Sequence, residues 1–156
     1  NLAPFIAKII DKTPLPIRLH RGWRLENEMH LHAHQPITGH AIIVGYGING
    51  QSIGLACEKV GISYLAVEMN PDTVEAARKQ GKEVAYGDAA SEAVLVEEGI
   101  RSAAYLIITI PDSIASRRIV ELGRRLNPLV TIIVRSKFLT EKKEFKAIGA
   151  DIVVAE

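Results

Sequence analysis

Hydrophobic runs recur along the chain from residue 40 onward, and segments with helical spacing separate them. Each run is continuously apolar and rich in β-branched residues, which is typical of strands buried on both faces of a parallel sheet. Right-handed crossovers then favour an α/β, doubly wound, parallel six-stranded sheet of order 3-2-1-4-5-6 with helices on both faces. We expect strands at residues 40–45, 62–70, 82–87, 103–110, 129–136 and 151–156, and helices at residues 49–61, 71–80, 91–99, 112–126 and 139–149.

Capping residues mark the ends of several of these helices. Asn70 occupies an N-cap position and Pro71 the first helical position, a pair that is typical of a helix start. Gly61, Gly81 and Gly99 close three helices at positions where a left-handed glycine is expected. These signals support the same division into elements as the hydrophobic pattern.

Residues 1–38 have a different character and are expected to form a linker or extended arm. All five histidines lie within the first 40 residues, together with four of the seven prolines and the single tryptophan, Trp23. No period of 3.6 or 2 persists through this segment, and only one short helix is expected, near residues 3–11. The chain therefore divides into an arm, residues 1–38, and one domain, residues 39–156.

Composition narrows the class of protein. A chain of 156 residues with 47% hydrophobic residues suits one domain with one sizeable core. Lys and Arg (19) nearly balance Asp and Glu (18), so no global positive field indicates a nucleic-acid partner. The single cysteine, Cys57, excludes an internal disulfide and is more simply a packed helix residue than a redox sensor. No apolar run approaches the roughly 20 residues of a membrane-spanning helix and no secretory signal is recognisable, so a soluble, cytoplasmic chain is expected.

A glycine-rich turn, GYGING, begins at Gly45 and links the first expected strand to the first helix. Its G-x-G-x-x-G spacing is the fingerprint of a Rossmann-like dinucleotide-binding turn, and the strand and helix that the fingerprint requires flank it. Gly45 permits the tight turn, Gly47 lets the backbone approach a pyrophosphate, and Gly50 lets the helix pack on the strand. The N–H groups of Ile48 and Asn49 then point at the phosphates from the positive end of the helix dipole. A structural turn without a ligand is the alternative.

An acidic residue is expected about 20 residues beyond such a turn, at the tip of the second strand, where it accepts hydrogen bonds from ribose hydroxyls. Glu68 stands there, with Asn70 two positions later. A carboxylate at this position also repels a 2′-phosphate, so NAD or a simple adenine nucleotide is favoured over NADP.

Residues for catalysis are missing from the same region. A dehydrogenase needs a proton donor or acceptor beside the nicotinamide and a second domain to hold its substrate. Of the five histidines only His40 touches the expected sheet, at the end away from the ligand crevice. Asp112, after the fourth strand, lines the crevice but is more simply a helix N-cap. The sequence therefore indicates binding without catalysis, and the alternative is a small NAD-dependent oxidoreductase or a fragment of one.

Six stretches after the arm carry a family pattern: IIVGYGINGQSIG, LAVEMNPDTVEAARKQG, VAYGDAASEAVLVEEGI, LIITIPD, NPLVTIIVRS and GADIVVAE. Together they resemble the RCK or TrkA-N regulatory nucleotide-binding domain of potassium transport systems, most closely that of Kef-type potassium/proton antiporters. The resemblance implies a domain that binds an adenine nucleotide or NAD(H) and gates monovalent cation transport without turning the ligand over. It also implies a homodimer and a transmembrane cation-transport domain in the same polypeptide, at the cytoplasmic face of the inner (plasma) membrane.

The resemblance also ranks the ligands. Many relatives carry a basic residue inside the glycine turn where this chain has Ile48. Fewer charges are then available for a polyphosphate, so AMP or NAD(H) is favoured, with ADP and ATP as further candidates.

Carried over residue by residue, the resemblance implies a binding set along the carboxyl edge of the sheet. The adenosine ribose is expected on Glu68, and the adenine beside residues 69–70 and 87–89. Residues 109–110 are expected to face the phosphates or a nicotinamide ribose, and Arg135 to pair with a phosphate. The full set, with no catalytic residue and no metal ligand, is Gly45, Tyr46, Gly47, Ile48, Asn49, Gly50, Glu68, Met69, Asn70, Gly87, Asp88, Ala89, Thr109, Ile110 and Arg135.

Two members of this set have plainer alternatives. Asp88 suits the cap of the helix that starts near residue 91 equally well. Arg135 also fits a solvated charge at a strand end. Both alternatives stay open at the level of sequence.

The same resemblance also implies a role for the arm, residues 1–38. Its first residues, NLAPFIAKII, look like the end of a final transmembrane helix or the segment just beyond it. Basic residues around Trp23 suit the membrane surface, where anionic lipid attracts them, and a solvated basic linker is the alternative. His30, His32 and His34 would share one face of an extended segment, but no further ligand completes a zinc site, so a linker without metal is expected. The basic residues are Lys8, Lys12, Arg18, Arg21 and Arg24.

Overall fold

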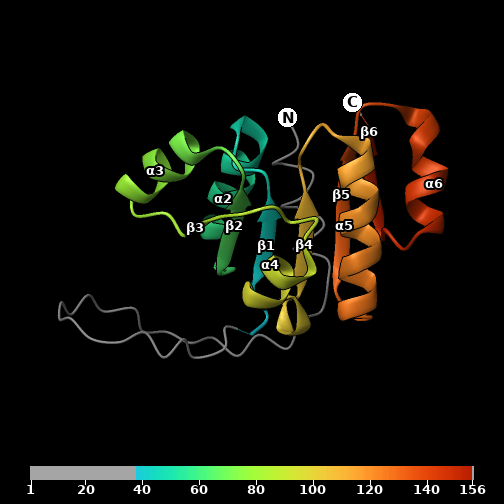
Figure 1. Cartoon of the computed structure of the whole chain (residues 1–156), viewed down its shortest axis with the longest axis horizontal. Coiled ribbons are helices and arrows are strands. Elements are labelled where there is room, and N and C mark those ends of the chain that lie inside the picture. The colour runs from blue at the N-terminus through green and yellow to red at the C-terminus, as the bar shows by residue number, and fades with distance from the viewer. Residues whose placement is uncertain (1–37, 156) are drawn as a thin grey trace.

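The structure, a computed structural model, describes residues 38–155 (Figure 1). The helix expected near residues 3–11, the basic residues of the arm and the three spaced histidines lie outside the described residues. The strands are β1 (Ala41–Val44), β2 (Tyr64–Glu68), β3 (Val84–Tyr86), β4 (Tyr105–Ile108), β5 (Thr131–Ser136) and β6 (Ile152–Ala155). The helices are α2 (Ile48–Val60), α3 (Pro71–Lys79), α4 (Glu92–Glu97), α5 (Ser113–Leu126) and α6 (Lys142–Ala147), with short 3-10 segments at Ile100–Ser102 and Leu139–Glu141.

The six strands form one parallel sheet in the order β3-β2-β1-β4-β5-β6. β1 lies between β2 and β4, so that Val44 is beside Val67 on one side and Ile108 on the other. Every residue of β1 and β4 is buried, as their continuously apolar sequences indicate. The predicted fold class and strand order are confirmed.

Helices cover both faces of this sheet (Figure 1). α2 and α3 pack on one face, where Cys57 and Val74 join the apolar side chains that alternate strand residues direct to that side. α4, α5 and α6 pack on the opposite face through Leu95, Ile119 and Phe145. The single cysteine is fully buried, which confirms its predicted role as a packing residue.

The helix ends follow the capping signals in the sequence. The side chain of Asn70 accepts hydrogen bonds from the backbone N–H groups of Asp72 and Thr73 at the start of α3. Asp112 caps α5 in the same way. Gly61 ends α2 with a left-handed φ of 76°. Both predicted N-caps are therefore confirmed.

Several elements are shorter than predicted where the backbone turns. β3 keeps only Val84–Tyr86 of the expected strand. α4 ends before Gly99, whose left-handed φ of 78° turns the chain into a 3-10 segment. The helix expected from residue 139 begins as a 3-10 turn and becomes α6 only at Lys142.

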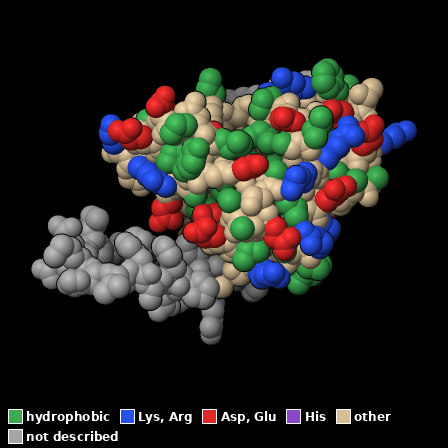
Figure 2. Space-filling view, in the orientation of Figure 1, with side chains coloured by type: hydrophobic (Ala, Val, Ile, Leu, Met, Phe, Trp, Pro, Cys, Tyr) green, Lys and Arg blue, Asp and Glu red, His purple; other side chains and the backbone are tan. Residues whose placement is uncertain are grey.

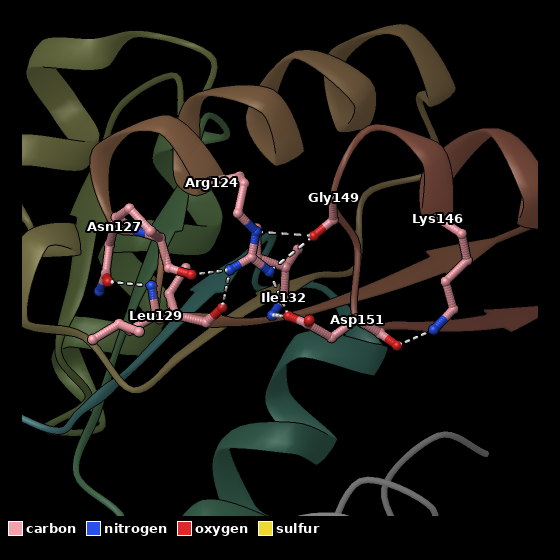
Figure 3. A network of polar contacts seen from close by, with 9 residues as sticks. Arg124, Asn127, Leu129, Ile132, Lys146, Gly149 and Asp151 are labelled. Carbon is pink, nitrogen blue, oxygen red and sulfur yellow. Dashed lines mark hydrogen bonds and ion pairs between the residues drawn. The ribbon is translucent and has the colours of Figure 1, made fainter.

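A polar network closes the amino edge of the sheet (Figure 3). Arg124, near the end of α5, makes five hydrogen bonds, which equals its number of N–H groups. One of its acceptors, the Asp151 carboxylate, also accepts from the backbone N–H of Ile132 at 2.7 Å. The network therefore ties the end of α5 to the starts of β5 and β6. The remaining acceptors of Arg124 are the carbonyl oxygens of Pro128, Val130 and Gly149.

Candidate nucleotide-binding site

The glycine turn lies at the carboxyl end of β1, where the strand order reverses between β2 and β4. Gly45 has a left-handed φ of 88°. A Cβ on Gly50 would lie 2.0 Å from the carbonyl oxygen of Gly45, so the close approach of α2 to the turn requires glycine there. A Cβ on Gly47, by contrast, would meet nothing within 4 Å. The turn is therefore tightly packed on the protein side and open beside Gly47.

The N-terminus of α2 differs from those of α3 and α5. Gly47 is the N-cap of α2, no side chain caps this helix, and its first turn carries no acidic residue. The other two helices are capped by the side chains of Asn70 and Asp112. The first N–H groups of a helix have no partner within the helix, and at Ile48 and Asn49 no side-chain cap supplies one. This N-terminus is suited to an anion such as a phosphate.

Glu68, the last residue of β2, holds its carboxylate against three backbone N–H groups. Oε2 accepts from Tyr46 at 2.7 Å. Oε1 accepts from Met69 and Asn70, each at 2.8 Å. Each carboxylate oxygen is able to accept two hydrogen bonds, so Oε2 retains capacity for one more donor. The predicted ribose acceptor thus lies directly beside the glycine turn.

The loops after β2 and β3, predicted to surround an adenine, lie next to each other. The N–H group of Gly87 donates to the carbonyl oxygen of Glu68 at 3.0 Å. Met69 is exposed beside them, whereas the side chain of Asn70 is engaged in capping α3. The structure therefore brings these predicted residues together, with Met69 presenting the largest exposed apolar surface among them.

The sequence left open that Asp88 caps the helix that starts near residue 91, and the structure gives it a different role. Its carboxylate accepts from the N–H of Ala90 at 2.8 Å, while Ser91 is the N-cap of α4. Asp88 therefore stabilises the turn before the helix and does not cap the helix itself. Ala89 is buried in the core.

On the other side of the turn, Thr109 is buried. Its hydroxyl shares a single proton between the carbonyl oxygens of Val44, at 2.9 Å, and Gly45, at 3.1 Å. Ile110 is half-buried against the core. Arg135, at the carboxyl end of β5, is also half-buried and donates from Nη1 to the Thr109 carbonyl oxygen at 3.3 Å. Thr109 and Arg135 are therefore engaged with the backbone beside the turn.

The side chain of Tyr46 has a role that the sequence did not indicate. Its ring stacks on that of Tyr64 with centroids 6.5 Å apart, and the two hydroxyl groups are 3.0 Å apart. Tyr64 donates to Glu58, which pairs with Lys82 at 2.6 Å. The hydrogen bond from Lys82 lowers the pKa of the Glu58 carboxyl. This chain of contacts anchors the glycine turn in the layer formed by α2 and α3.

The titratable and metal-binding groups of the described residues add to this description of the carboxyl edge. Within residues 38–155 no group of three or more His, Cys, Asp and Glu side chains is placed to hold a metal ion. Burial raises the pKa of the Cys57 thiol to about 11, so the thiol stays protonated and unreactive near neutral pH. Backbone N–H groups of α2 and the Glu68 carboxylate are the groups placed beside the glycine turn. No helix in the described part of the chain is long and apolar enough to cross a membrane.

Several solved structures and several protein sequences are similar to this chain. The TrkA-N domain of the inner membrane protein YbaL from Escherichia coli superimposes with a TM-score of 0.72 at 31% identity, covering 76% of this chain and 88% of that chain. The Kef CTD of Shewanella denitrificans in AMP-bound form gives a TM-score of 0.66 at 26% identity, covering 76% of this chain and 71% of that chain. The glutathione-regulated potassium-efflux system protein KefC of Cronobacter sakazakii is 35% identical over 96 residues, which are 62% of this chain and 16% of KefC.

The matched relatives are much longer than this chain. Its match to the whole YbaL protein of Escherichia coli K12 covers 118 residues, 21% of that protein. The chain thus spans about a fifth or less of the length of the curated relatives that it matches.

The family model of the TrkA-N domain matches residues 41–156, from the first residue of β1 onward. This match confirms the resemblance drawn from the glycine turn and the other five stretches of sequence. The chain belongs to the TrkA-N domain family.

Proposed function

We propose that residues 39–156 form a nucleotide-sensing regulatory domain of a Kef-type potassium (monovalent cation) antiporter. The observation that carries the proposal is the uncapped N-terminus of α2 beside the Glu68 carboxylate, which together offer donors for a phosphate and an acceptor for ribose hydroxyls. The family adds support, because KefC is a potassium-efflux system protein and the Kef CTD of Shewanella denitrificans has an AMP-bound form.

The proposed ligand is an adenine nucleotide, with AMP favoured. Ile48 stands in the turn and supplies no charge for a second or third phosphate. The backbone N–H groups of α2 suit one phosphate, and Glu68 Oε2 is able to accept from a ribose hydroxyl. NAD(H) is the next candidate, and ADP and ATP come after it.

The proposed setting is the cytoplasmic face of the inner membrane. Residues 1–38 are a juxtamembrane arm that leads from a transmembrane cation-transport domain of the same polypeptide, and the regulatory domain acts as a homodimer. Acidic and basic side chains are interspersed over the face that α4 and α5 present (Figure 2), which supports a function without a nucleic-acid partner.

Regulation requires no chemical step on the nucleotide. If the nucleotide binds one arrangement of the regulatory domain more tightly than another, the difference in affinity biases the transporter toward that arrangement. The domain is therefore proposed to bind its ligand without turning it over.

The first experiment is calorimetric titration of the chain with AMP, ADP, ATP, NAD and NADH, repeated on two variants of Gly47. This glycine has an ordinary φ of −70° and open space for a side chain, so Gly47→Asp and Gly47→Asn should both fold. Both side chains are able to cap α2, but only aspartate adds a negative charge where the phosphate is expected. We expect AMP to bind the wild type, and Gly47→Asp to bind it at least about tenfold more weakly than Gly47→Asn.

Two results would contradict the proposal. If none of the five nucleotides binds the wild-type chain, the turn has no ligand and the sensor proposal is wrong. If NADH is oxidised by general acceptors faster in the presence of the protein than alone, the chain is an oxidoreductase.

A further inference from the structure

We propose that Thr109 is a positioning residue for the ribose-binding carboxylate, and that it acts through a single peptide unit of the glycine turn. The inference rests on the proposed function, since it assigns a role within the same site. Thr109 directly follows β4, Glu68 ends β2, and β1 lies between these strands. The two residues are therefore linked across the carboxyl edge of the sheet through the turn that leaves β1.

The peptide unit between Gly45 and Tyr46 is hydrogen-bonded on both sides. Its carbonyl oxygen, on Gly45, lies 3.1 Å from the Thr109 hydroxyl and shares the hydroxyl proton with the Val44 carbonyl oxygen at 2.9 Å. Its N–H group, on Tyr46, donates to Glu68 Oε2 at 2.7 Å. Because a peptide unit is planar and rigid, fixing its carbonyl oxygen also fixes the direction of its N–H group. The threonine hydroxyl thus contributes to the direction in which the turn offers its N–H group to the carboxylate.

Packing confines the same peptide unit. A Cβ on Gly45 would lie 2.9 Å from the Thr109 hydroxyl oxygen, and a Cβ on Gly50 would lie 2.0 Å from the Gly45 carbonyl oxygen. The carbonyl therefore lies between the threonine and the backbone of α2. Thr109 itself is 6% exposed. With its hydroxyl removed, the Gly45 carbonyl would lose this donor in a place that water reaches poorly.

The effect on Glu68 follows from the distribution of its donors. Oε1 is held by Met69 and Asn70, which adjoin Glu68 in sequence. Oε2, the oxygen with remaining acceptor capacity, is held only by the Tyr46 N–H among the hydrogen bonds of the described residues. If this N–H turns away, Oε2 loses the contact that orients it toward the turn. Recognition of a ribose hydroxyl should therefore weaken more than recognition of a phosphate.

Hydroxyl-deleting and hydroxyl-retaining variants test this role. Thr109→Val preserves the side-chain shape and removes the hydroxyl, Thr109→Ala removes it without adding bulk, and Thr109→Ser retains it. The Val44 carbonyl keeps a donor in all three variants, because the backbone N–H of Thr109 bonds to it at 2.9 Å. Thr131→Val is the matched control, since it removes a threonine hydroxyl from the amino end of β5.

Two readouts are measured on each variant, namely hydrogen exchange of the Tyr46 amide and affinity for AMP and for 2′-deoxy-AMP. For Thr109→Val and Thr109→Ala we expect faster exchange and AMP binding about tenfold weaker, because a buried acceptor is left without its donor. The wild-type preference for AMP over 2′-deoxy-AMP should fall toward one in both. Thr109→Ser and Thr131→Val should keep wild-type exchange and preference.

The outcomes separate the inference from the proposed function. Wild-type AMP affinity and ribose preference in a folded Thr109→Val or Thr109→Ala variant would overturn the inference alone. A loss of affinity equal for AMP and 2′-deoxy-AMP would also overturn it, since a general loosening of the fold predicts that result. A wild-type chain that binds no nucleotide would overturn both proposals.

Discussion

The two ends of the same sheet use their hydrogen-bonding groups differently. At the amino edge, Arg124 has an acceptor for each of its N–H groups (Figure 3). The buried side-chain amide of Asn127 donates to the carbonyl oxygens of Ile100 and Ala103. At the carboxyl edge, no side chain caps α2 at Gly47. The chain satisfies its polar groups at the end that holds the fold together. It leaves the N-terminus of α2 without a side-chain cap at the end where a ligand is proposed.

The polar groups of the two edges of this domain contribute differently to stability and to binding. A polar group that is satisfied within the protein contributes to folding, whereas one left at the surface is able to serve a ligand. Substitutions at the amino edge should therefore change stability with little effect on nucleotide affinity. Substitutions at the carboxyl edge should change affinity, and should change stability as well only where the turn is tightly packed.

The largest effect is expected at the tightly packed part of the turn. In Gly50→Ala the new methyl group would lie 2.0 Å from a backbone oxygen, so α2 has to move away from β1. We expect a loss of about 3 kcal/mol or more in the free energy of unfolding, measured with urea, together with loss of AMP binding. The control is Gly61→Ala at the other end of α2, where the Cβ has open space and only the left-handed φ of 76° is unfavourable.

Gly61→Ala should lower the free energy of unfolding by about 1 kcal/mol and leave AMP affinity unchanged. Equal stability of the two variants would mean that α2 does not depend on close contact with the turn. In that case the expectation that the two ends of α2 differ in how tightly they must pack would be wrong.

The next effect is expected at the amino edge. Arg124→Ala removes five hydrogen bonds, one of which is also the ion pair with Asp151. Arg124→Lys retains the charge without the planar set of donors. We expect the free energy of unfolding to fall by about 2 to 3 kcal/mol for alanine and by less for lysine. AMP affinity, measured at a temperature where both variants are folded, should stay at the wild-type value. A loss comparable to that of Gly47→Asp would show that the two edges are coupled.

Most of the fold could be predicted from the sequence, because it depends on local patterns. Continuously apolar runs identified the strands, and Asn70 and Asp112 identified two helix starts. The short 3-10 segments were missed, since a left-handed glycine such as Gly99 marks the end of a helix but does not specify the conformation of the next residues.

The candidate site could be predicted only in part, because its side-chain contacts depend on which strands are neighbours. The glycine turn and Glu68 follow from spacing along the chain. The bond from Tyr46 to Glu68 joins residues 22 apart, and that from Thr109 to Gly45 joins residues 64 apart. No period or local motif specifies such contacts, so the role of Thr109 emerges only once β4 is placed beside β1.

The smallest effect is expected from Cys57, which is on α2, the helix that joins the two edges. Burial raises the pKa of its thiol from 9.0 to about 11, so between these values the unfolded chain loses the proton while the folded chain keeps it. The stabilising contribution is fully present below pH 9.0 and is lost as the pH rises toward 11, amounting to about 1 kcal/mol by pH 10. Urea denaturation at about pH 8 and about pH 10 should show this loss in the wild type and a smaller one in Cys57→Ala. Because the thiol is on the protein-facing side of α2, saturating AMP should add the same increment of stability in both proteins at each pH. An AMP increment that changes with the Cys57 substitution would mean that the packed side of α2 and its open N-terminus are not independent.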